Sequence, residues 1–83
     1  MSNYFVTFGQ KYAYEPHPTL PGAHSDGVLK VVAKDGADAR RLVFDTIGGF
    51  WAFMYDEEQI AGDMHFYPAG VTHVLDSDGI REE

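Results

Sequence analysis

The stretch from Glu15 to Gly27 constrains this chain most, because it separates two segments with strand-like patterns. It contains three prolines and two glycines within thirteen residues. Proline lacks an amide hydrogen and fixes φ, so neither a helix nor an interior strand fits here. Loops of this length are uncommon in compact domains and are often functional. We therefore predict a long loop that is the chief surface feature of the molecule.

The segments on either side of this loop have the pattern of β-strands. Tyr4–Phe8 alternates aromatic and β-branched residues at a period of two, and Lys11–Tyr14 could continue that strand beyond a bulge. Asp26 and Gly27 form a turn signal that leads into a second strand over Val28–Lys34. The lysines of this second strand share one face, so we expect that face to be partly solvated.

A helix is predicted directly after the second strand. Asp35 is a good N-cap, Asp38 stands where a capping box has its acidic residue, and Gly48 and Gly49 follow the last turn. Phe44 lies off the apolar stripe of this helix and is expected to cover a sheet edge. The stripe consists of residues at helical spacing, namely Ala39, Leu42, Val43, Thr46 and Ile47.

The second half of the chain predicts further strands. Phe50–Tyr55 is apolar on both faces, which is typical of a central strand covered on both sides. A helical turn is expected from Asp56 through Ile60. We expect short strands over Met64–Tyr67 and Val71–Leu75, and a flexible polar tail over residues 76–83.

This order of elements predicts an α+β fold. We expect a small, mostly antiparallel sheet of four or five strands with one helix packed on one face. Residues 1–83 are expected to form a single domain. The second strand and the Phe50–Tyr55 strand could instead run parallel, as in a β-α-β unit, and the sequence leaves this open.

Composition excludes several classes of protein. The absence of cysteine excludes disulfides, a thiolate nucleophile and cysteine-ligated metal sites. No apolar run is long enough to span a membrane, and the start of the chain lacks a basic leader, so a cytoplasmic location is expected. Residues 42–83 hold nine acidic side chains and only Arg81 as a basic one, a balance that disfavours direct nucleic-acid binding.

Two groups of residues are candidate binding sites. His17, His24 and Asp26, with Glu15, lie in the loop and have the chemistry of ligands for a divalent metal. Their spacing matches no standard metal motif, so the alternative is exposed or locally hydrogen-bonded histidines that shape the loop. His65 and His73 could join such a site, or could be half-buried strand residues with one satisfied ring nitrogen.

The second group lies beside the loop. Its amide, ammonium and phenol groups could hold an anionic or nucleotide ligand, or could be polar strand ends with aromatic anchors. The group consists of Gln10, Lys11, Tyr12, Tyr14 and Tyr55.

Five segments carry a resemblance to known proteins: residues 4–12, Glu15–Pro18, His24–Gly27, Trp51–Tyr55 and Phe66–Pro68. Over residues 3–70 the chain resembles a group of small uncharacterised proteins encoded by actinobacteria and by their phages. This resemblance implies a phage or prophage setting and no mechanism. Small phage proteins of this kind often bind a host component.

Three functions follow from these patterns. The first is a small non-enzymatic binding module that engages a host protein, or forms a homodimer through an exposed sheet edge or aromatic face. Its binding residues are expected in the loop from Gln10 to Asp26, together with Tyr55. The second is a metal- or small-ligand-binding protein that uses the His17 and His24 loop. The third is an acidic decoy for nucleic-acid-binding proteins, built from Asp56, Glu57, Glu58 and Asp63.

Overall fold

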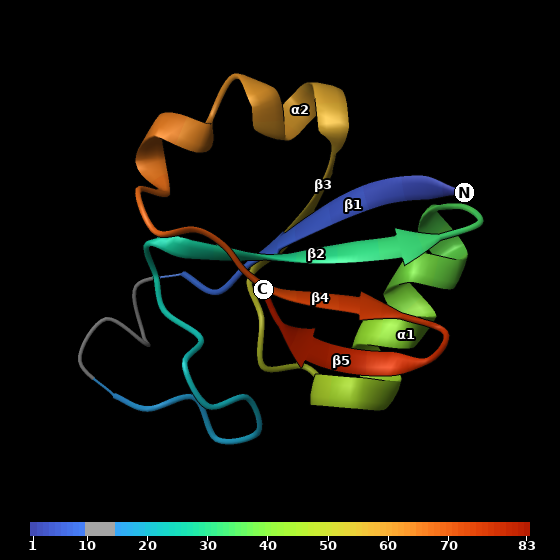
Figure 1. Ribbon diagram of the computed structural model, residues 1–83, viewed down its shortest axis with the longest axis horizontal. Coiled ribbons are helices and arrows are strands. Elements are labelled where there is room, and N and C mark those ends of the chain that lie inside the picture. The colour runs from blue at the N-terminus through green and yellow to red at the C-terminus, as the bar shows by residue number, and fades with distance from the viewer. Residues whose placement is uncertain (10–14) are drawn as a thin grey trace.

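A computed structural model of the chain describes residues 1–9 and 15–83 (Figure 1). The expected continuation of the first strand over Lys11–Tyr14 lies outside these residues. The elements, in chain order, are β1 (Ser2–Thr7), β2 (Gly27–Ala33), α1 (Gly36–Ile47), β3 (Phe53–Asp56), α2 (Glu57–Ala61), the 3-10 turn η2 (Met64–Phe66), β4 (Gly70–Asp76) and β5 (Gly79–Glu82).

The strands form one mixed five-stranded sheet in the order β3-β1-β2-β4-β5. Three neighbouring pairs are antiparallel, and only β2 and β4 are parallel. The α+β class, with one main helix packed on the sheet, is confirmed. Since β2 and β3 are both antiparallel to β1, they run in the same direction with β1 between them. This arrangement answers the question that the sequence left open.

Helix α1 begins and ends where the sequence predicts. The Asp35 carboxylate accepts a hydrogen bond from the Asp38 amide at 2.8 Å, and the Asp38 carboxylate accepts one from the Lys34 amide. Gly48 ends the helix with a φ of 66°, a conformation that glycine adopts without steric cost. The buried stripe is Ala39, Val43 and Ile47, with Leu42 partly buried. The inclusion of Thr46 in that stripe was wrong, because its side chain is exposed.

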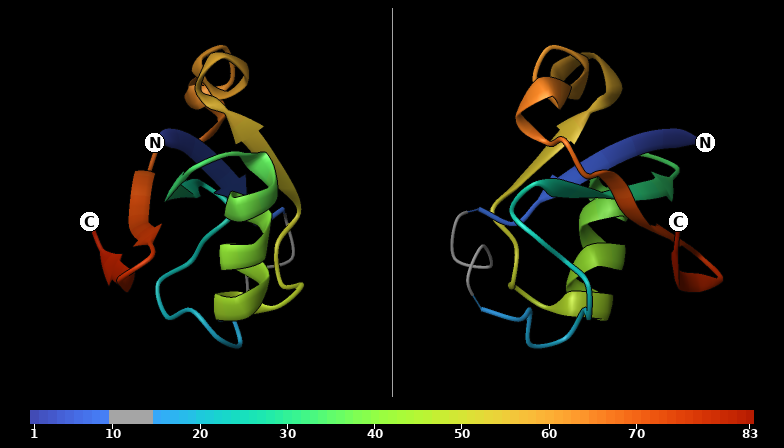
Figure 2. Two further views of the ribbon diagram at one scale, coloured as in Figure 1. Left: turned by 90° about the vertical axis from the view of Figure 1, so that its right-hand side faces the viewer. Right: turned by 60° about the vertical axis from the view of Figure 1, so that its left-hand side comes forward.

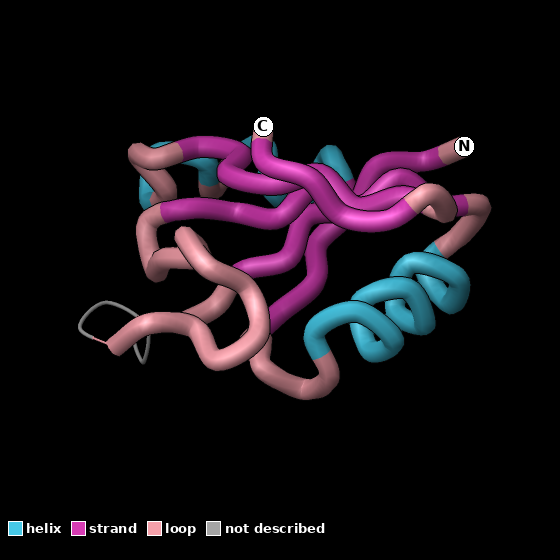
Figure 3. Tube along the Cα trace, turned by 60° about the horizontal axis from the view of Figure 1, so that its bottom comes forward, coloured by secondary structure: helices cyan, strands magenta, loops and turns pink. Residues whose placement is uncertain are grey.

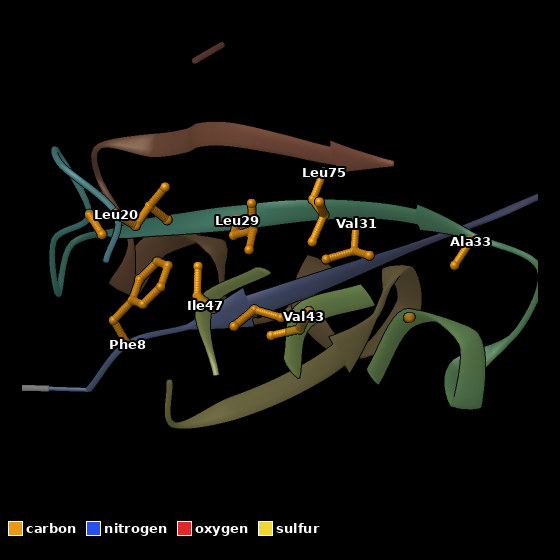
Figure 4. Packing of buried hydrophobic residues seen from close by; sticks show 11 residues of the cluster. Phe8, Leu20, Leu29, Val31, Ala33, Val43, Ile47 and Leu75 are labelled. Carbon is orange, nitrogen blue, oxygen red and sulfur yellow. The ribbon is translucent and has the colours of Figure 1, made fainter. Parts of the chain in front are cut away.

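One face of the sheet packs against α1 and the loop to form the core (Figures 3 and 4). Along β2, Leu29, Val31 and Ala33 point into this core, as their alternation predicts. The loop contributes Leu20 and Ala23, both buried. The predicted surface loop is therefore only partly at the surface, because its apolar side chains complete the core beyond the end of α1.

The opposite face of the sheet is covered in part by α2 and η2, which lie together at one end of the molecule (Figure 2). Helix α2 begins at a capping box formed by Asp56 and Gln59, and it buries Ile60. The helical turn expected over Asp56–Ile60 is thus confirmed. No helix within the described residues is long and apolar enough to cross a membrane.

The segment Phe50–Tyr55 differs most from its prediction. Its strand is β3, at an edge of the sheet, and not a central strand covered on both sides. Only residues 53–55 of the predicted segment are in the strand, and Phe53 is 64% exposed, so the strand is not covered on both sides. Phe50, which precedes the strand, is 43% exposed. The apolar run suggested a buried strand, but strand order depends on pairing partners that are distant in sequence.

Two further predictions require correction. Residues Met64–Tyr67 form a 3-10 turn and not a strand, since the Tyr67 amide hydrogen-bonds the Met64 carbonyl. The expected flexible tail over residues 76–83 contains a strand, because β5 pairs with β4 in a hairpin (Figure 1). The Arg81 guanidinium donates to the Asp76 carboxylate at 2.9 Å and supports this pairing.

Candidate functional site

The residues predicted to form a binding site fall into separate surroundings. Gln10, Lys11 and Tyr12, together with Tyr14, lie outside the described residues. His17 lies within the loop, His24 and Asp26 lie where the loop enters β2, and Tyr55 lies in β3. Among the described residues, no hydrogen bond or ion pair joins His17 to the other three.

His17 is buried and organises the loop. Its Nδ1 accepts hydrogen bonds from the backbone amides of Thr19 and Leu20 at 3.1 and 3.0 Å. Its Nε2 therefore carries the proton and donates to the Phe50 carbonyl at 2.7 Å. The ring also packs edge-on against Phe8 and Phe50. Both ring nitrogens are occupied, so a metal could bind His17 only by displacing these bonds.

His24 and Asp26 lie closer to the solvent. The His24 Nδ1 accepts from the Asp26 amide at 3.1 Å and lies 3.8 Å from the Asp26 carboxylate. Within residues 1–9 and 15–83, no three histidine or acidic side chains lie close enough together to hold a metal. His24 is a locally hydrogen-bonded loop histidine, which is the alternative to a metal ligand given above. His17 is also hydrogen-bonded within the loop, but it is buried.

His73 is a second buried histidine that holds the loop to the sheet. It lies in β4, and its Nε2 donates to the Pro21 carbonyl at 3.1 Å. Its Nδ1 lies 2.9 Å from the Thr72 hydroxyl, so both ring nitrogens have hydrogen-bond partners. From the sequence, a partner was expected for only one of them. His65, by contrast, is exposed in η2 and stacks on Phe66, so it is not a half-buried strand residue.

Tyr55 is the predicted site residue that lies on the sheet edge. Removal from water raises the pKa of its phenol above the ordinary value, and the nearby Tyr67 and Asp63 add to this. These causes place the Tyr55 phenol near Tyr67 and Asp63, in the segment that follows α2. In β3 it pairs with Phe5 of β1, while the other side of β3 has no strand neighbour among residues 1–9 and 15–83.

Aromatic side chains flank this open edge on both sides. Trp51 and Phe44 meet edge-on, with ring centroids 5.5 Å apart, on the side that packs against α1. Met54 packs against the same core, so its neighbours Phe53 and Tyr55 point to the opposite side of the strand. Their rings lie 6.2 Å apart. We refer to Phe44, Trp51, Phe53 and Tyr55, with the backbone of β3, as the aromatic edge.

The aromatic edge is held in place from the helix. The indole Nε1 of Trp51 donates to the Gly48 carbonyl at 3.1 Å, just beyond the end of α1. The Arg40 guanidinium lies 5.9 Å from the Trp51 ring centroid, which is within cation–π distance. Phe44, expected to cover a sheet edge, is half exposed against Trp51. Contacts with the helix thus orient Trp51 while leaving it only partly buried.

A hollow of about 410 Å³ runs along β3 between α1 and α2. Its floor is formed by Tyr4 and Met54, and its helix side by Gly36, Ala37 and Arg40. Tyr55, Asp56 and Gln59 line the remaining side. The open edge of the sheet is therefore next to a hollow with both apolar and polar walls.

Sequence reasoning identified Tyr55 in this region but missed Phe53. The signal was present, because an aromatic run on both faces fits an exposed interface strand as well as a buried one. Only the position of β3 in the sheet distinguishes the two.

Comparisons of this chain with models of protein families, with curated proteins and with solved structures find no match. Function has to be argued from the geometry of the chain itself.

Proposed function

We propose that this protein is a small non-enzymatic binding module that engages another protein through the aromatic edge. The observation that carries the proposal is the 64% exposure of Phe53 on an edge strand. Exposed aromatic groups beside the outer side of an edge strand are costly to leave in water, and aromatic groups are enriched at interface centres. The sequence resemblance to proteins of actinobacteria and their phages further supports a partner that comes from the bacterial host of such a phage.

The hydrogen bonds that hold the loop to the rest of the fold also favour the edge over the loop as the binding surface. His17 and His73 use their ring nitrogens to hold the loop against Phe50 and Pro21 respectively. These histidines therefore act in folding. A metal-binding function would require His17 to leave its two amide donors. We expect that adding zinc or a chelator leaves the melting temperature unchanged, and a clear shift would favour the metal alternative.

Two matched substitutions test the proposal. Phe53 and Phe66 are exposed to nearly the same extent, 64% and 63%, but only Phe53 belongs to the aromatic edge. Immobilised wild-type protein, Phe53→Ser and Phe66→Ser would each be used to capture proteins from host lysate. We expect Phe53→Ser to lose a partner that Phe66→Ser retains.

Two results would contradict the proposal. Equal loss in both variants would indicate general adhesion of exposed rings, and no reproducible capture by the wild type would remove the proposed function. Sedimentation of the wild type at increasing concentration would show whether the partner is a second copy of the chain.

A further inference from the structure

We propose that the partner adds an extended segment as a sixth strand along β3, and that this segment alternates basic and apolar residues. The inference rests on the proposed function and specifies its partner. A strand at the edge of a sheet presents unpaired amide and carbonyl groups that another chain can pair with. The hollow between α1 and β3 leaves room for side chains on one face of such a strand.

Charge identifies the chemistry of the occupant. Within the described residues, the ion pairs join Asp38 and Asp45 to Arg41, and Asp76 to Arg81. None involves the acidic residues at the end of β3 and in the segment that follows, which are Asp56, Glu57, Glu58 and Asp63. Asp56 ends β3, and Glu57 and Glu58 follow it directly, so a segment added along β3 would have these carboxylates near one of its ends, where they favour a basic segment.

The aromatic edge accounts for the alternation. On one face of the added strand, side chains would enter the hollow, where Met54 and Tyr4 offer apolar contact and Arg40 repels a cation. On the other face they would lie beside Phe53 and Tyr55, whose ring faces attract ammonium groups. Apolar residues therefore belong toward the helix and basic residues away from it, at the period of two that a strand imposes.

The same charges disfavour a second copy of this chain. Each copy carries a formal net charge of −7, so two copies held edge to edge would repel each other overall. A basic partner removes this repulsion.

The experiment uses the full chain and a short synthetic peptide of alternating lysine and valine. Binding would be followed by the fluorescence of Trp51, the only tryptophan, and by hydrogen exchange of the β3 amides. One control peptide has each lysine replaced by glutamate. A second control has the same composition as the test peptide, with its lysines in one block and its valines in another. A third peptide carries N-methyl groups on alternate residues, which removes strand pairing and keeps the side chains.

Matched protein variants separate local from overall charge. D56N/E57Q/E58Q neutralises the end of the aromatic edge, and asparagine still caps α2. D78N/E82Q/E83Q removes three exposed acidic groups near the other sheet edge. We expect the first variant to weaken binding of the alternating peptide about tenfold, and the second to weaken it less than about twofold.

The proposal predicts slower exchange of the β3 amides with the alternating peptide, and loss of binding after N-methylation. It would be overturned by equal binding of the blocked or N-methylated peptide, by protection at β5 in place of β3, or by no binding up to about 1 mM. If exchange of the β3 amides slows at higher protein concentration without any peptide, the edge binds a second copy of the chain and the proposal is overturned. The peptide could fail to bind while capture of a host protein still depends on Phe53. That result would reject strand addition by a basic segment and would leave the proposed function supported.

Discussion

The two edges of the sheet differ in how they meet the solvent. At β5, Ile80 packs against the core and Arg81 pairs with Asp76, so the exposed positions are glycine and charged residues. At β3, Phe53 is exposed and the carboxylates that follow have no cationic partner among the described residues. Charges and twisted hairpins commonly protect sheet edges from pairing. The comparison shows that β5 has such protection and β3 largely lacks it.

The largest effect is expected from Trp51, which joins α1 to the β3 edge. We expect Trp51→Ala to lower the free energy of unfolding by about 2–3 kcal/mol, less than for a fully buried tryptophan because the ring is partly exposed. Urea denaturation measures this loss. Hydrogen exchange should accelerate more at β3 than at β5, and equal acceleration at both would show that Trp51 does not anchor β3 in particular.

A second pair of variants compares the apolar side chains of the two edges. Ile80→Ala should cost about 1–2 kcal/mol, because Ile80 is partly buried against the core. Phe53→Ala should cost less than about 0.5 kcal/mol, although it removes a larger side chain. Both values come from urea denaturation. A loss at Phe53 as large as that at Ile80 would mean that the Phe53 ring stabilises the fold, and would weaken its assignment to binding.

A third prediction concerns the titration of Tyr55 in β3. Its raised pKa means that the folded state favours the neutral phenol. The resulting stability is complete below the ordinary tyrosine pKa of about 10 and is lost as the pH rises through the higher folded value. Phenolate absorbance should show this late titration, and Asp63→Asn should bring it closer to the ordinary value. An unshifted titration in the wild type would contradict the closeness of Tyr55 to Tyr67 and Asp63.

The smallest effect is expected at the protected edge. The hydrogen bond from Arg81 lowers the pKa of the Asp76 carboxyl, and the Asp78 amide lowers it further. The stability from this pair is present above the ordinary aspartate pKa and is lost as the pH falls through the lower folded value. Asp76→Asn should slightly reduce the fall in the free energy of unfolding at acidic pH. It should also speed amide hydrogen exchange in β5. Exchange at β3 serves as the control and should not change.

Part of the candidate site could be predicted from the sequence. Tyr55 and the acidic residues after it were identified from their chemistry, and Phe44 was expected at a sheet edge. Phe53 was assigned to a covered strand, because an apolar run by itself does not show whether another element covers it. The loop histidines His17 and His24 were expected to be metal ligands, or to be exposed or locally bonded. The burial of His17 depends on Phe8 and Phe50, which the sequence does not place beside it.

The sequence by itself determined the local elements of this protein. Asp35 and Gly48 bound α1, Asp56 caps α2, and alternation sets the faces of β1 and β2, because these features depend on hydrogen bonds and side-chain directions among residues close in the chain. Tertiary structure alone decided that β3 is an edge, that the loop enters the core and that the last residues pair with β4. Each of these depends on which distant segments pair or pack together, and burial of the shared apolar core determines that choice.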